Sequence, residues 1–554
     1  MKNYRLLVSV VLFSAACSGG GGGQSVDSGS PSGSGGKVTG SGGASPAGTG
    51  GSATGGSGGS QGTGGAGGMG GSGGMVAMPT GQSVTERSGG PARTGHFIRP
   101  ALTKANAAMM AADAGFNATY MGNIWNTPLF VENGPGGKGA FYVATQQNQV
   151  YAFDATTGAQ IWMKSVGAVA QGGPCGNFGY TSVGVFGTPA IDLGSKTIFV
   201  AAANGPNGIQ SFKVHAFNLD DGSEKAPWPL DLGTIIGGGF NAAQQNQRGA
   251  LTIVNGILYI PLGGHVGDCG DARGRVVAIN ITDPTKTGAW ATSDQGSTIW
   301  APGGLASDGT GIFATTGNHF PNNTAPATHG DSEEVVRLTG LAQLTRNDQN
   351  IFYPMRWRAM DSGDLDFGAN SPLVMDVPGA TPAKFIAASS KDGHIYFLDP
   401  NNLGGMGGQK FDLTIAAEGM SSLKTTPASY VTATGAYVVL STGSPRGCPA
   451  GVGGSVVMGV SVAVAGGMIQ PKVAWCSAIS GDGSPVVTTT DGKTDAIVWY
   501  ISGGMLKGVD GDTGTMVFQG GNCAVQRWNS PIVAAGGRIV AGANGKLCSW
   551  SVPP

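Results

Sequence analysis

Short apolar runs separated by glycine-, asparagine- and aspartate-rich turns recur along most of the chain. The clearest copy has apolar runs at residues 150–153 and 160–166, joined by the sequence D-A-T-T-G that begins at Asp154. Aspartate caps such a turn, and glycine supplies the positive φ that it requires. Two further apolar runs, at residues 128–131 and 141–145, precede this copy. The pattern predicts four short strands of one antiparallel sheet, with the tryptophan after the turn packed between neighbouring sheets.

The turn recurs at fairly regular spacing, and repeats of this kind decide the architecture. The equivalent turn positions are Asp154, Asn218, Asn280, Leu338, Asp399, Ser461, Asp510 and Ser551. Four-stranded units repeated in this way are typical of β-propellers, which have about 4–8 blades. We therefore predict an all-β fold, an eight-bladed propeller. Seven blades, with one divergent unit counted twice, is the alternative.

The last repeat supplies only three strands. Residues 531–552 hold these strands, and a candidate for the missing outer strand lies near the other terminus, at residues 116–125. Pairing the two ends of the chain in one sheet closes the ring and covers an exposed strand edge. We therefore expect an N-terminal strand to close the ring.

The first residues are typical of an export signal. Lys2 and Arg5 precede an apolar run at residues 6–16, which is about half the length of a membrane-spanning helix. The following S-A-A-C resembles a bacterial lipobox, with Cys17 as the lipidated residue. We predict a lipoprotein signal peptide over residues 1–17 and a lipid anchor in the outer membrane or at the cell surface. Ordinary secretion with an incidental cysteine is the alternative.

Composition divides the remaining chain into two parts. Residues 18–79 consist largely of glycine, serine, alanine and threonine, and they include many of the 102 glycines. Such a segment cannot bury enough apolar surface to offset its ordering entropy. We predict a disordered tether over residues 18–79 and the propeller over residues 80–554.

Charge and hydropathy exclude some classes of partner. The chain has 31 Lys and Arg residues against 32 Asp and Glu residues, and no basic stripe. Nucleic acid is therefore not an expected partner. No later apolar stretch reaches membrane-spanning length, so the lipid is the only expected contact with a membrane. The protein is expected to be a monomer.

Cysteine usage agrees with export. The cysteines other than Cys17 are Cys175, Cys269, Cys448, Cys476, Cys523 and Cys548. An even number in an exported chain favours disulfides. Cys523 with Cys548 and Cys448 with Cys476 are the pairs nearest in sequence, which leaves Cys175 with Cys269. The connectivity stays open, as does the alternative of free buried thiols.

Several repeats resemble a known family. They are VYAFDATTGAQIW, GTPAIDLGSKTIFVAA, NQRGALTIVNGILYIPLGGHVGDCG, GIFATTGNHF and SKDGHIYFLDPNNLGG. They resemble the pyrroloquinoline-quinone (PQQ) repeat of the quinoprotein alcohol dehydrogenase-like propellers. The last three are most similar to an exported bacterial subset of largely unassigned activity. The resemblance implies the propeller fold and leaves the function open, because many such propellers act as scaffolds without a cofactor.

The resemblance implies a PQQ site that this chain matches in part. In that family a tryptophan forms the floor under the quinone, and an asparagine 18 residues later binds calcium. Here Trp300 is followed by Asn318 at the same spacing. A flat quinone stacks on an aromatic ring, and calcium accepts amide oxygens beside carboxylates.

Further positions follow from the same resemblance. Asp366 stands where the family has its catalytic aspartate, which accepts the alcohol proton. Lys391 lies near the position of a basic residue that contacts the quinone oxygens, and Asp268 is the nearest match to the calcium-binding glutamate.

The departures from the family are substantial. The chain has no adjacent cysteine pair and no C-x-x-C-H haem attachment, and Asp268 is shorter than the family's glutamate. Structural roles therefore remain as alternatives: Trp300 as an apolar plug, Asn318 as a turn residue and Asp366 as a strand-end cap.

Other polar residues are candidates for a ligand site. Arg248 and Arg527 each precede a strand start, where a propeller side chain points toward the channel and can bind an anion or pair with a carboxylate. His265, His319 and His329 lie in loops that form either a polar mouth or a solvated rim.

Two functional hypotheses result. The first is a lipid-anchored propeller that binds an envelope protein or a small ligand at the channel mouth. The second is a PQQ- and calcium-dependent dehydrogenase of alcohols or sugars. No cofactor is required by the first hypothesis, and PQQ and Ca²⁺ are required by the second.

Overall fold

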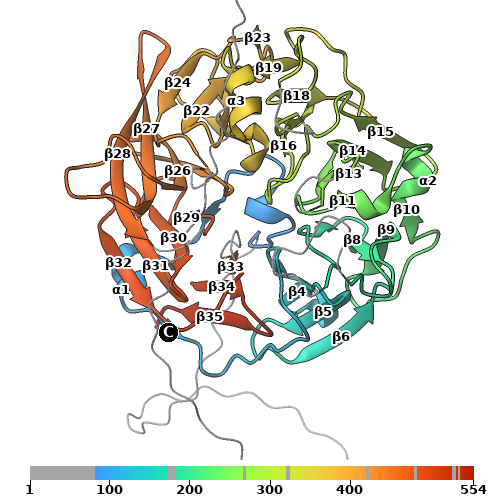
Figure 1. The fold of residues 1–554 in the computed structure, drawn as a ribbon. Coiled ribbons are helices and arrows are strands. Elements are labelled where there is room, and N and C mark those ends of the chain that lie inside the picture. Colours follow the sequence, from blue (N-terminus) through green and yellow to red (C-terminus); the bar gives the residue numbers. More distant parts are fainter. Residues whose placement is uncertain are drawn as a thin grey trace, which may run out of the picture. The chain divides into compact units, whose positions relative to one another are not determined.

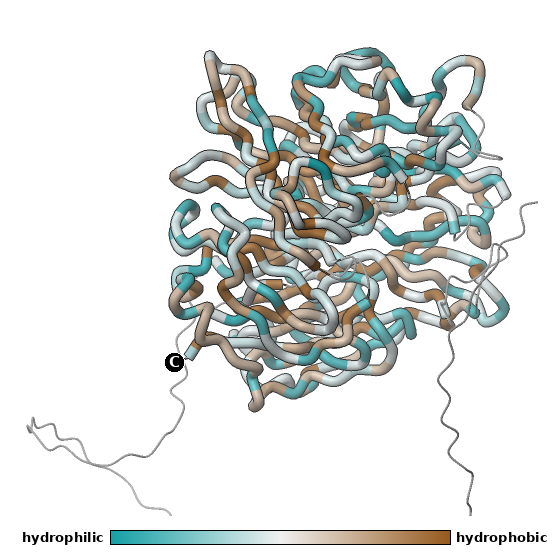
Figure 2. The backbone as a smooth tube through the Cα atoms, turned by 60° about the vertical axis from the view of Figure 1, so that its left-hand side comes forward, coloured by the Kyte–Doolittle hydropathy of each residue, from teal (hydrophilic) through white to brown (hydrophobic). Residues whose placement is uncertain are grey.

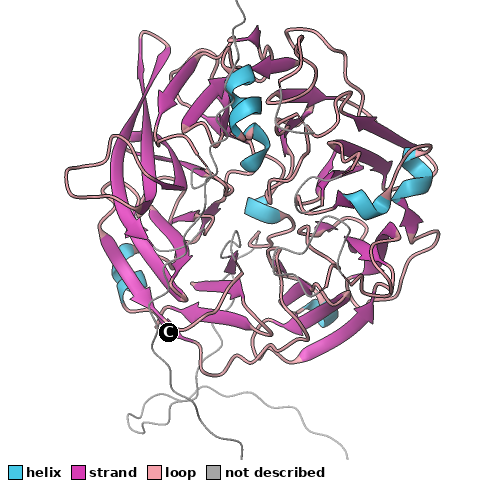
Figure 3. Ribbon diagram, viewed as in Figure 1, coloured by secondary structure: helices cyan, strands magenta, loops and turns pink. Residues whose placement is uncertain are grey.

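Eight β-sheets surround a common axis (Figures 1 and 3). The computed structural model describes residues 81–171, 182–265, 270–319, 325–419, 423–479, 483–526, 532–534 and 537–553. The eight sheets confirm the eight-bladed prediction and exclude the seven-bladed alternative. Among the described residues, no helix combines the length and the apolar character needed to cross a membrane.

The first strand of each repeat lies near the axis, and later strands follow outward (Figure 1). Blade 7 also has the N-terminal strand β1 (His96–Ile98), which pairs parallel with its first strand on the inner edge of the sheet. Blade 1 contains β3 (Leu129–Val131), β4 (Ala140–Ala144), β5 (Gln149–Asp154) and β6 (Gln160–Ser165). Blade 2 contains β7 (Ala190–Asp192), β8 (Thr197–Asn204), β9 (Ser211–Asn218) and β10 (Leu230–Asp231). Blade 3 contains β11 (Gln245–Asn246), β12 (Thr252–Val254), β13 (Ile257–Gly264), β14 (Arg275–Asn280) and β15 (Thr287–Ala291). Blade 4 contains β16 (Ala306–Ser307), β17 (Ile312–Thr315), β18 (Val335–Leu338), β19 (Ile351–Tyr353) and β23 (Gly405–Met406).

The remaining blades follow the same plan. Blade 5 contains β20 (Leu373–Asp376), β21 (Lys384–Ser389), β22 (His394–Leu398) and β24 (Phe411–Thr414). Blade 6 contains β25 (Ala428–Thr432), β26 (Gly435–Gly443), β27 (Ser455–Ala465) and β28 (Met468–Ile479). Blade 7 contains β29 (Val486–Thr489), β30 (Ile497–Ser502), β31 (Met505–Asp510), β32 (Met516–Gly520) and β1 (His96–Ile98). Blade 8 contains β33 (Ile532–Ala534), β34 (Arg538–Gly542), β35 (Leu547–Ser551) and β2 (Ala111–Ala112).

The helical segments are short and lie between strands. They are η1 (Arg87–Gly89), α1 (Lys104–Ala108), η2 (Pro135–Gly137), α2 (Leu232–Ile236), η3 (Ala242–Gln244), α3 (Trp357–Gly363) and η4 (Phe367–Ala369).

The repeated turn falls where the third strand of a blade ends. Asp154, for example, is the last residue of β5, and its carboxylate accepts the backbone N–H groups of Thr156 and Thr157 at 3.0 and 2.8 Å. Ser461 is the exception, because β27 continues beyond it to Ala465. The prediction of a turn at Ser461 is therefore wrong; this blade has an elongated outer hairpin instead.

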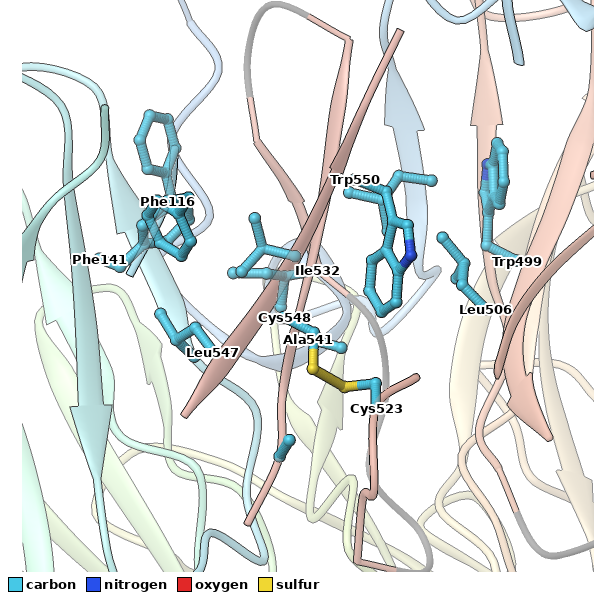
Figure 4. Close-up of a cluster of buried hydrophobic side chains, with 14 of the residues drawn as sticks. Phe116, Phe141, Trp499, Leu506, Cys523, Ile532, Ala541, Leu547, Cys548 and Trp550 are labelled. Carbon is cyan, nitrogen blue, oxygen red and sulfur yellow. A yellow bond between two sulfur atoms is a disulfide. The ribbon is translucent and has the colours of Figure 1, made fainter. Parts of the chain in front are cut away.

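An N-terminal strand closes the ring, as predicted, but it is not the predicted segment. The outer strand of blade 8 is β2, which pairs antiparallel with β35. Within residues 116–125, Thr119 forms only an isolated bridge with Lys546. The apolar residues of that segment serve the core instead: Phe116 packs edge-on against Phe141 with ring centroids 5.7 Å apart (Figure 4).

Buried apolar side chains from neighbouring blades form shared clusters. Along the backbone, hydrophilic stretches gather at the turns (Figure 2). Of the tryptophans that follow the repeated turn, Trp162 and Trp228 are buried in these clusters, as predicted, whereas Trp290 is half-buried. The Trp162 indole donates to the Leu219 carbonyl at 2.9 Å, and that of Trp475 donates to the Gly511 carbonyl at 2.7 Å. Trp162 and Trp475 thus each join their own blade to the repeated turn of the next.

Two disulfides are present among the described residues. Cys448 is bonded to Cys476 within blade 6, and Cys523 is bonded to Cys548 in the core beside blade 8 (Figure 4). Both pairs agree with the nearest-neighbour pairing. The third pair, Cys175 with Cys269, lies outside the described residues.

Residues 82–95, here called the axial segment, cross the centre of the ring and contact the first strands of seven blades in order. Figure 1 shows its helical turn η1 at the centre of the ring. Backbone hydrogen bonds join Val84 to Phe130, Thr85 to Ile191, Pro91 to Ser307, Ala92 to Val374, Thr94 to Ser429 and Gly95 to Val487. The remaining blade of the seven, blade 3, is reached by the Glu86 carboxylate, which accepts from Ile253 N at 2.9 Å. One short segment therefore ties the inner strands together.

Two fully buried arginines anchor the axial segment. Arg93 forms an ion pair with Glu86 at 3.0 Å and donates to the carbonyls of Leu251 and Leu305 at 2.9 Å each. Arg87 donates to three hydroxyl groups that precede inner strands, those of Thr127, Thr426 and Ser484. Burial and the nearby Arg93 charge lower the pKa of Arg87 to about 9.

Candidate functional site

Five predicted site residues lie at the same end of the ring. In an antiparallel blade, the connections between blades and those between second and third strands share one end, here called the site end. Arg248, Trp300 and Asp366 precede the inner strands β12, β16 and β20. Asn318 follows the second strand β17, and Lys391 follows the second strand β21. The repeated turns lie at the opposite end.

Two cations from other blades lie near the half-buried ring of Trp300. The Arg248 guanidinium carbon and the Lys391 Nζ each lie 5.5 Å from the centroid of the indole ring. Cations at this distance are attracted by the negative face of the ring. Three residues that are far apart in the sequence therefore form one cationic aromatic cluster, in which Arg248 and Trp300 are half-buried and Lys391 is buried.

Asp366 contacts this cluster through Lys391 and is almost fully buried. One carboxylate oxygen forms an ion pair with Lys391 Nζ, and the other accepts the backbone N–H of Asn318 at 3.0 Å. Burial opposes ionisation of Asp366, but the Lys391 ammonium outweighs it and holds the pKa of Asp366 below its usual value. The structure thus brings Asp366, Lys391 and Asn318 together.

Asp364 is a site residue that sequence reasoning missed. It ends α3 in the left-handed conformation, and its carboxylate lies 3.1 Å from Lys391 Nζ. Burial and the charge of Asp366 raise the pKa of Asp364, although its side chain is still 36% exposed. The signal was a second aspartate in D-L-D, two positions before Asp366.

Two buried acids, also missed, lie behind the loops that carry Asn318 and Asp366. The Glu333 carboxylate accepts the backbone N–H of Phe367 at 2.5 Å, and Asp361 accepts that of His319 at 2.8 Å. Burial raises the pKa of both acids. Nothing in the S-E-E sequence at Glu333 distinguishes it from an exposed loop acid.

The described residues supply only part of a calcium site. Asn318 and Asp366 contribute neighbouring oxygen-bearing side chains, whereas Ca²⁺ takes about 6–8 oxygen ligands. Among the described residues, no group of three or more His, Cys, Asp or Glu side chains is arranged to hold a metal ion. Asp268 lies outside the described residues, as do Arg527 and Cys17.

The predicted histidine loops are largely packed rather than open. His265 is buried, and His329 stacks on Tyr353 with ring centroids 3.5 Å apart. Burial lowers the pKa of His329 to about 4. His319 is half-buried beside Asn318. His265 and His329 thus have a structural environment, and the site centres on Trp300.

Comparison of the sequence with family models and with curated proteins gives no match. Solved structures do match. They include the quinohemoprotein alcohol dehydrogenase from Comamonas testosteroni, with 15% identity over 85% of this chain and 80% of that chain, and a TM-score of 0.59. A second quinohemoprotein alcohol dehydrogenase, from Pseudomonas putida HK5, has 13% identity over the same shares and a TM-score of 0.62.

A europium-containing methanol dehydrogenase also matches, with 14% identity over 85% of this chain and 98% of that chain, and a TM-score of 0.59. At these identities the likeness shows the fold alone. The chain therefore shares the propeller fold of these dehydrogenases.

Proposed function

We propose that this propeller binds a small, flat, multiply anionic ligand at its site end. The observation that carries the proposal is the Trp300 ring with Arg248 and Lys391 at equal distances of 5.5 Å. An aromatic face supports stacking of a flat ligand, and two cations beside it offset negative charge on that ligand. Arg248, Trp300 and Lys391 belong to the consecutive blades 3, 4 and 5, so the cluster requires these blades to pack side by side.

PQQ is the ligand that these residues fit best. It is a flat quinone with three carboxylates, and quinohemoprotein dehydrogenases are among the structural neighbours. Trp300 would stack on the ring system, and Arg248 and Lys391 would bind its anionic groups. The calcium part of the family site fits less well, because among the described residues no group of three or more His, Cys, Asp or Glu side chains is arranged to hold a metal ion.

Binding of PQQ to the purified full chain tests the proposal. We expect PQQ to raise Tm by mass action and to quench tryptophan fluorescence. Trp300→Leu and Lys391→Met should each weaken binding by about tenfold or more, as loss of a stacking or charged contact does. Lys384→Met is the matched control, because Lys384 forms an exposed ion pair with Asp376. No binding by the wild type, or equal binding by all four proteins, would refute the proposal.

The second candidate function is a PQQ- and calcium-dependent dehydrogenase of alcohols or sugars. The environment of Asp364 favours this second function, since a general base needs access to substrate and a pKa near the working pH. Asp364 is partly exposed with a raised pKa, whereas Lys391 lowers the pKa of Asp366. Bound PQQ would supply the two-electron acceptor, and Asp364 would take the alcohol proton.

Turnover separates the two candidates. With PQQ and Ca²⁺, a dehydrogenase reduces an artificial electron acceptor when an alcohol or sugar is added, and Asp364→Asn should abolish turnover but retain PQQ binding. Binding of PQQ without turnover of any alcohol or sugar would leave the first candidate alone.

The proposal includes a location outside the cytoplasm, with a lipid on Cys17 as the membrane anchor of a monomer. Two disulfides support an oxidising compartment. Cys17→Ser should move the protein from the membrane fraction to the soluble fraction. An envelope protein as partner at the site end is a separate hypothesis, which cross-linking in cells tests.

A further inference from the structure

Glu333 connects the two loops that carry Asn318 and Asp366. Its backbone N–H donates to the Gly317 carbonyl at 3.1 Å, directly before Asn318. Its side-chain Oε2 accepts from Phe367 N at 2.5 Å, directly after Asp366. Glu333 therefore bridges the two loops, in addition to the direct hydrogen bond from Asn318 N to the Asp366 carboxylate.

The space between these loops is fully occupied. A Cβ atom on Gly317 would lie 2.4 Å from Asp366 Oδ1, and one on Gly368 would lie 2.7 Å from Gly317 N. Glu333 itself has a φ of +52°, which is uncommon for a residue other than glycine. Strained conformations of this kind persist where the surroundings fix them, and they occur at functional sites.

The Glu333 carboxyl is better suited to a neutral than to a charged state. It is completely buried, and its second oxygen, Oε1, has no hydrogen-bond partner. The charged groups that face it are Asp366, Asp361 and Lys391. Burial and the two aspartates raise the pKa of Glu333 well above its usual value, and Lys391 offsets this only in part.

We infer that Glu333 is a positioning residue, a neutral carboxyl that holds the Asn318 and Asp366 loops together and thereby keeps Lys391 beside Trp300. Lys391 depends on this arrangement, because its ammonium pairs with Asp366 and its backbone N–H donates to the Asp366 carbonyl at 3.3 Å. The role of Lys391 in ligand binding rests on the proposed function, whereas the positioning of Lys391 by Glu333 does not.

The reactivity of Lys391 tests the positioning without any ligand. Lys391 is 3% exposed and should react slowly with an amine-acylating reagent, as followed by peptide mass spectrometry, whereas exposed Lys384 provides the internal reference. Glu333→Leu removes the acceptor for Phe367 N–H, and we expect Lys391 to react at least about fivefold faster. Glu333→Gln keeps an acceptor oxygen without charge, and its rate should stay within about twofold of wild type.

Glu224→Gln is the matched control, since Glu224 pairs with His215 at the opposite end of the ring. An unchanged Lys391 rate in Glu333→Leu would refute the positioning role. An equally fast rate in Glu333→Gln would show that a charge is needed and would also refute it. If Glu333→Leu does not fold, the pH profile of Lys391 labelling provides the test. The labelling rates of wild type and Glu333→Gln should have the same pH dependence between about pH 5 and pH 8. An additional titration step in wild type alone would show that Glu333 is not a neutral carboxyl.

PQQ binding supplies the link to function. Glu333→Leu should weaken PQQ binding by about fivefold or more, in parallel with the faster labelling. If wild type does not bind PQQ, the proposed function fails, whereas the labelling result still decides the role of Glu333. Faster labelling with unchanged PQQ affinity would refute the part of the inference that connects Glu333 to the ligand site.

Discussion

Lys391 is the residue on which the site depends most, because three groups share its ammonium. It pairs with Asp366 and Asp364 and lies 5.5 Å from the centroid of the Trp300 ring. An anionic ligand on Trp300 competes with both carboxylates for this one cation. Binding of the proposed ligand would therefore be coupled to the protonation of Asp364 and Asp366, since a carboxylate that loses its cation gains affinity for a proton.

His96 gives a pH dependence with a definite sign. Its Nε2 is 2.8 Å from the Thr489 hydroxyl, and burial lowers its pKa from 6.5 to about 4. Between these values the unfolded chain binds a proton at His96 and the folded protein does not, so acidification destabilises the fold. Relative to His96→Gln, the free energy of unfolding of wild type should fall by up to about 1.4 kcal/mol per pH unit from pH 6.5 to pH 4.

Urea unfolding of both proteins at several pH values measures this difference. The comparison with the variant cancels the contributions of the buried acids, such as Glu333, whose raised pKa values act in the opposite direction. A difference that is constant with pH would contradict the prediction.

At the residue scale, the family resemblance predicted the residues of the candidate site but missed the buried residue that holds their loops in place. The spacing of Trp300 and Asn318 and the position of Lys391 identified residues that the fold brings together. Glu333 was not predictable, because its role depends on burial and on a backbone N–H group of another loop. Asp268 and Arg527 remain predictions.

The axial segment is the element on which ring stability depends most directly. Arg93→Met removes its ion pair with Glu86 and leaves that acid buried without its cation. Breaking a buried pair in this way costs about 3–5 kcal/mol, and urea unfolding should show a loss of that size. Arg358→Met, at an exposed arginine, is the control and should change stability by less than about 1 kcal/mol.

The double variant Glu86→Gln with Arg93→Met should lose less stability than the sum of the two single changes, because no unpaired charge remains. Additive losses, or an Arg93→Met loss as small as that of the control, would show that the axial segment is not a structural anchor.

At the element scale, the repeat predicted the blades because each blade uses the same pattern of strands and turns. The axial segment and β2 do not repeat, and β2 is only two residues long, so no periodicity marks them. We predicted a strand at residues 116–125, but the apolar residues of this segment pack in the core, where Phe116 contacts Phe141. One sequence feature could have indicated the axial segment. Several inner strands are preceded by a hydroxyl residue and a proline, as at Thr127 and Ser484, and both of these hydroxyl groups accept from Arg87 of the axial segment.

At the scale of the whole molecule, the ring closes where the two ends of the folded chain meet. Blade 8 combines β33, β34 and β35 from the C-terminal end with β2 from the N-terminal end. The Cys523–Cys548 disulfide joins the segment after blade 7 to β35 in the same core. The Cys448–Cys476 disulfide has a similar sequence separation, 28 against 25 residues, but lies within blade 6. The blade 6 disulfide is therefore a matched control for testing whether the Cys523–Cys548 disulfide contributes to ring closure.

Because the loops are of similar length, chain entropy predicts a similar loss of about 3.5 kcal/mol when either disulfide is replaced by alanines. The location of the loss should differ. Hydrogen exchange should rise in β2, β35 and the axial segment after Cys523→Ala with Cys548→Ala, since local opening there separates the two ends of the ring. After Cys448→Ala with Cys476→Ala, it should rise only in the outer hairpin of blade 6. Equal exchange patterns in the two variants would mean that closure is held by β2 and the axial segment without help from the disulfide.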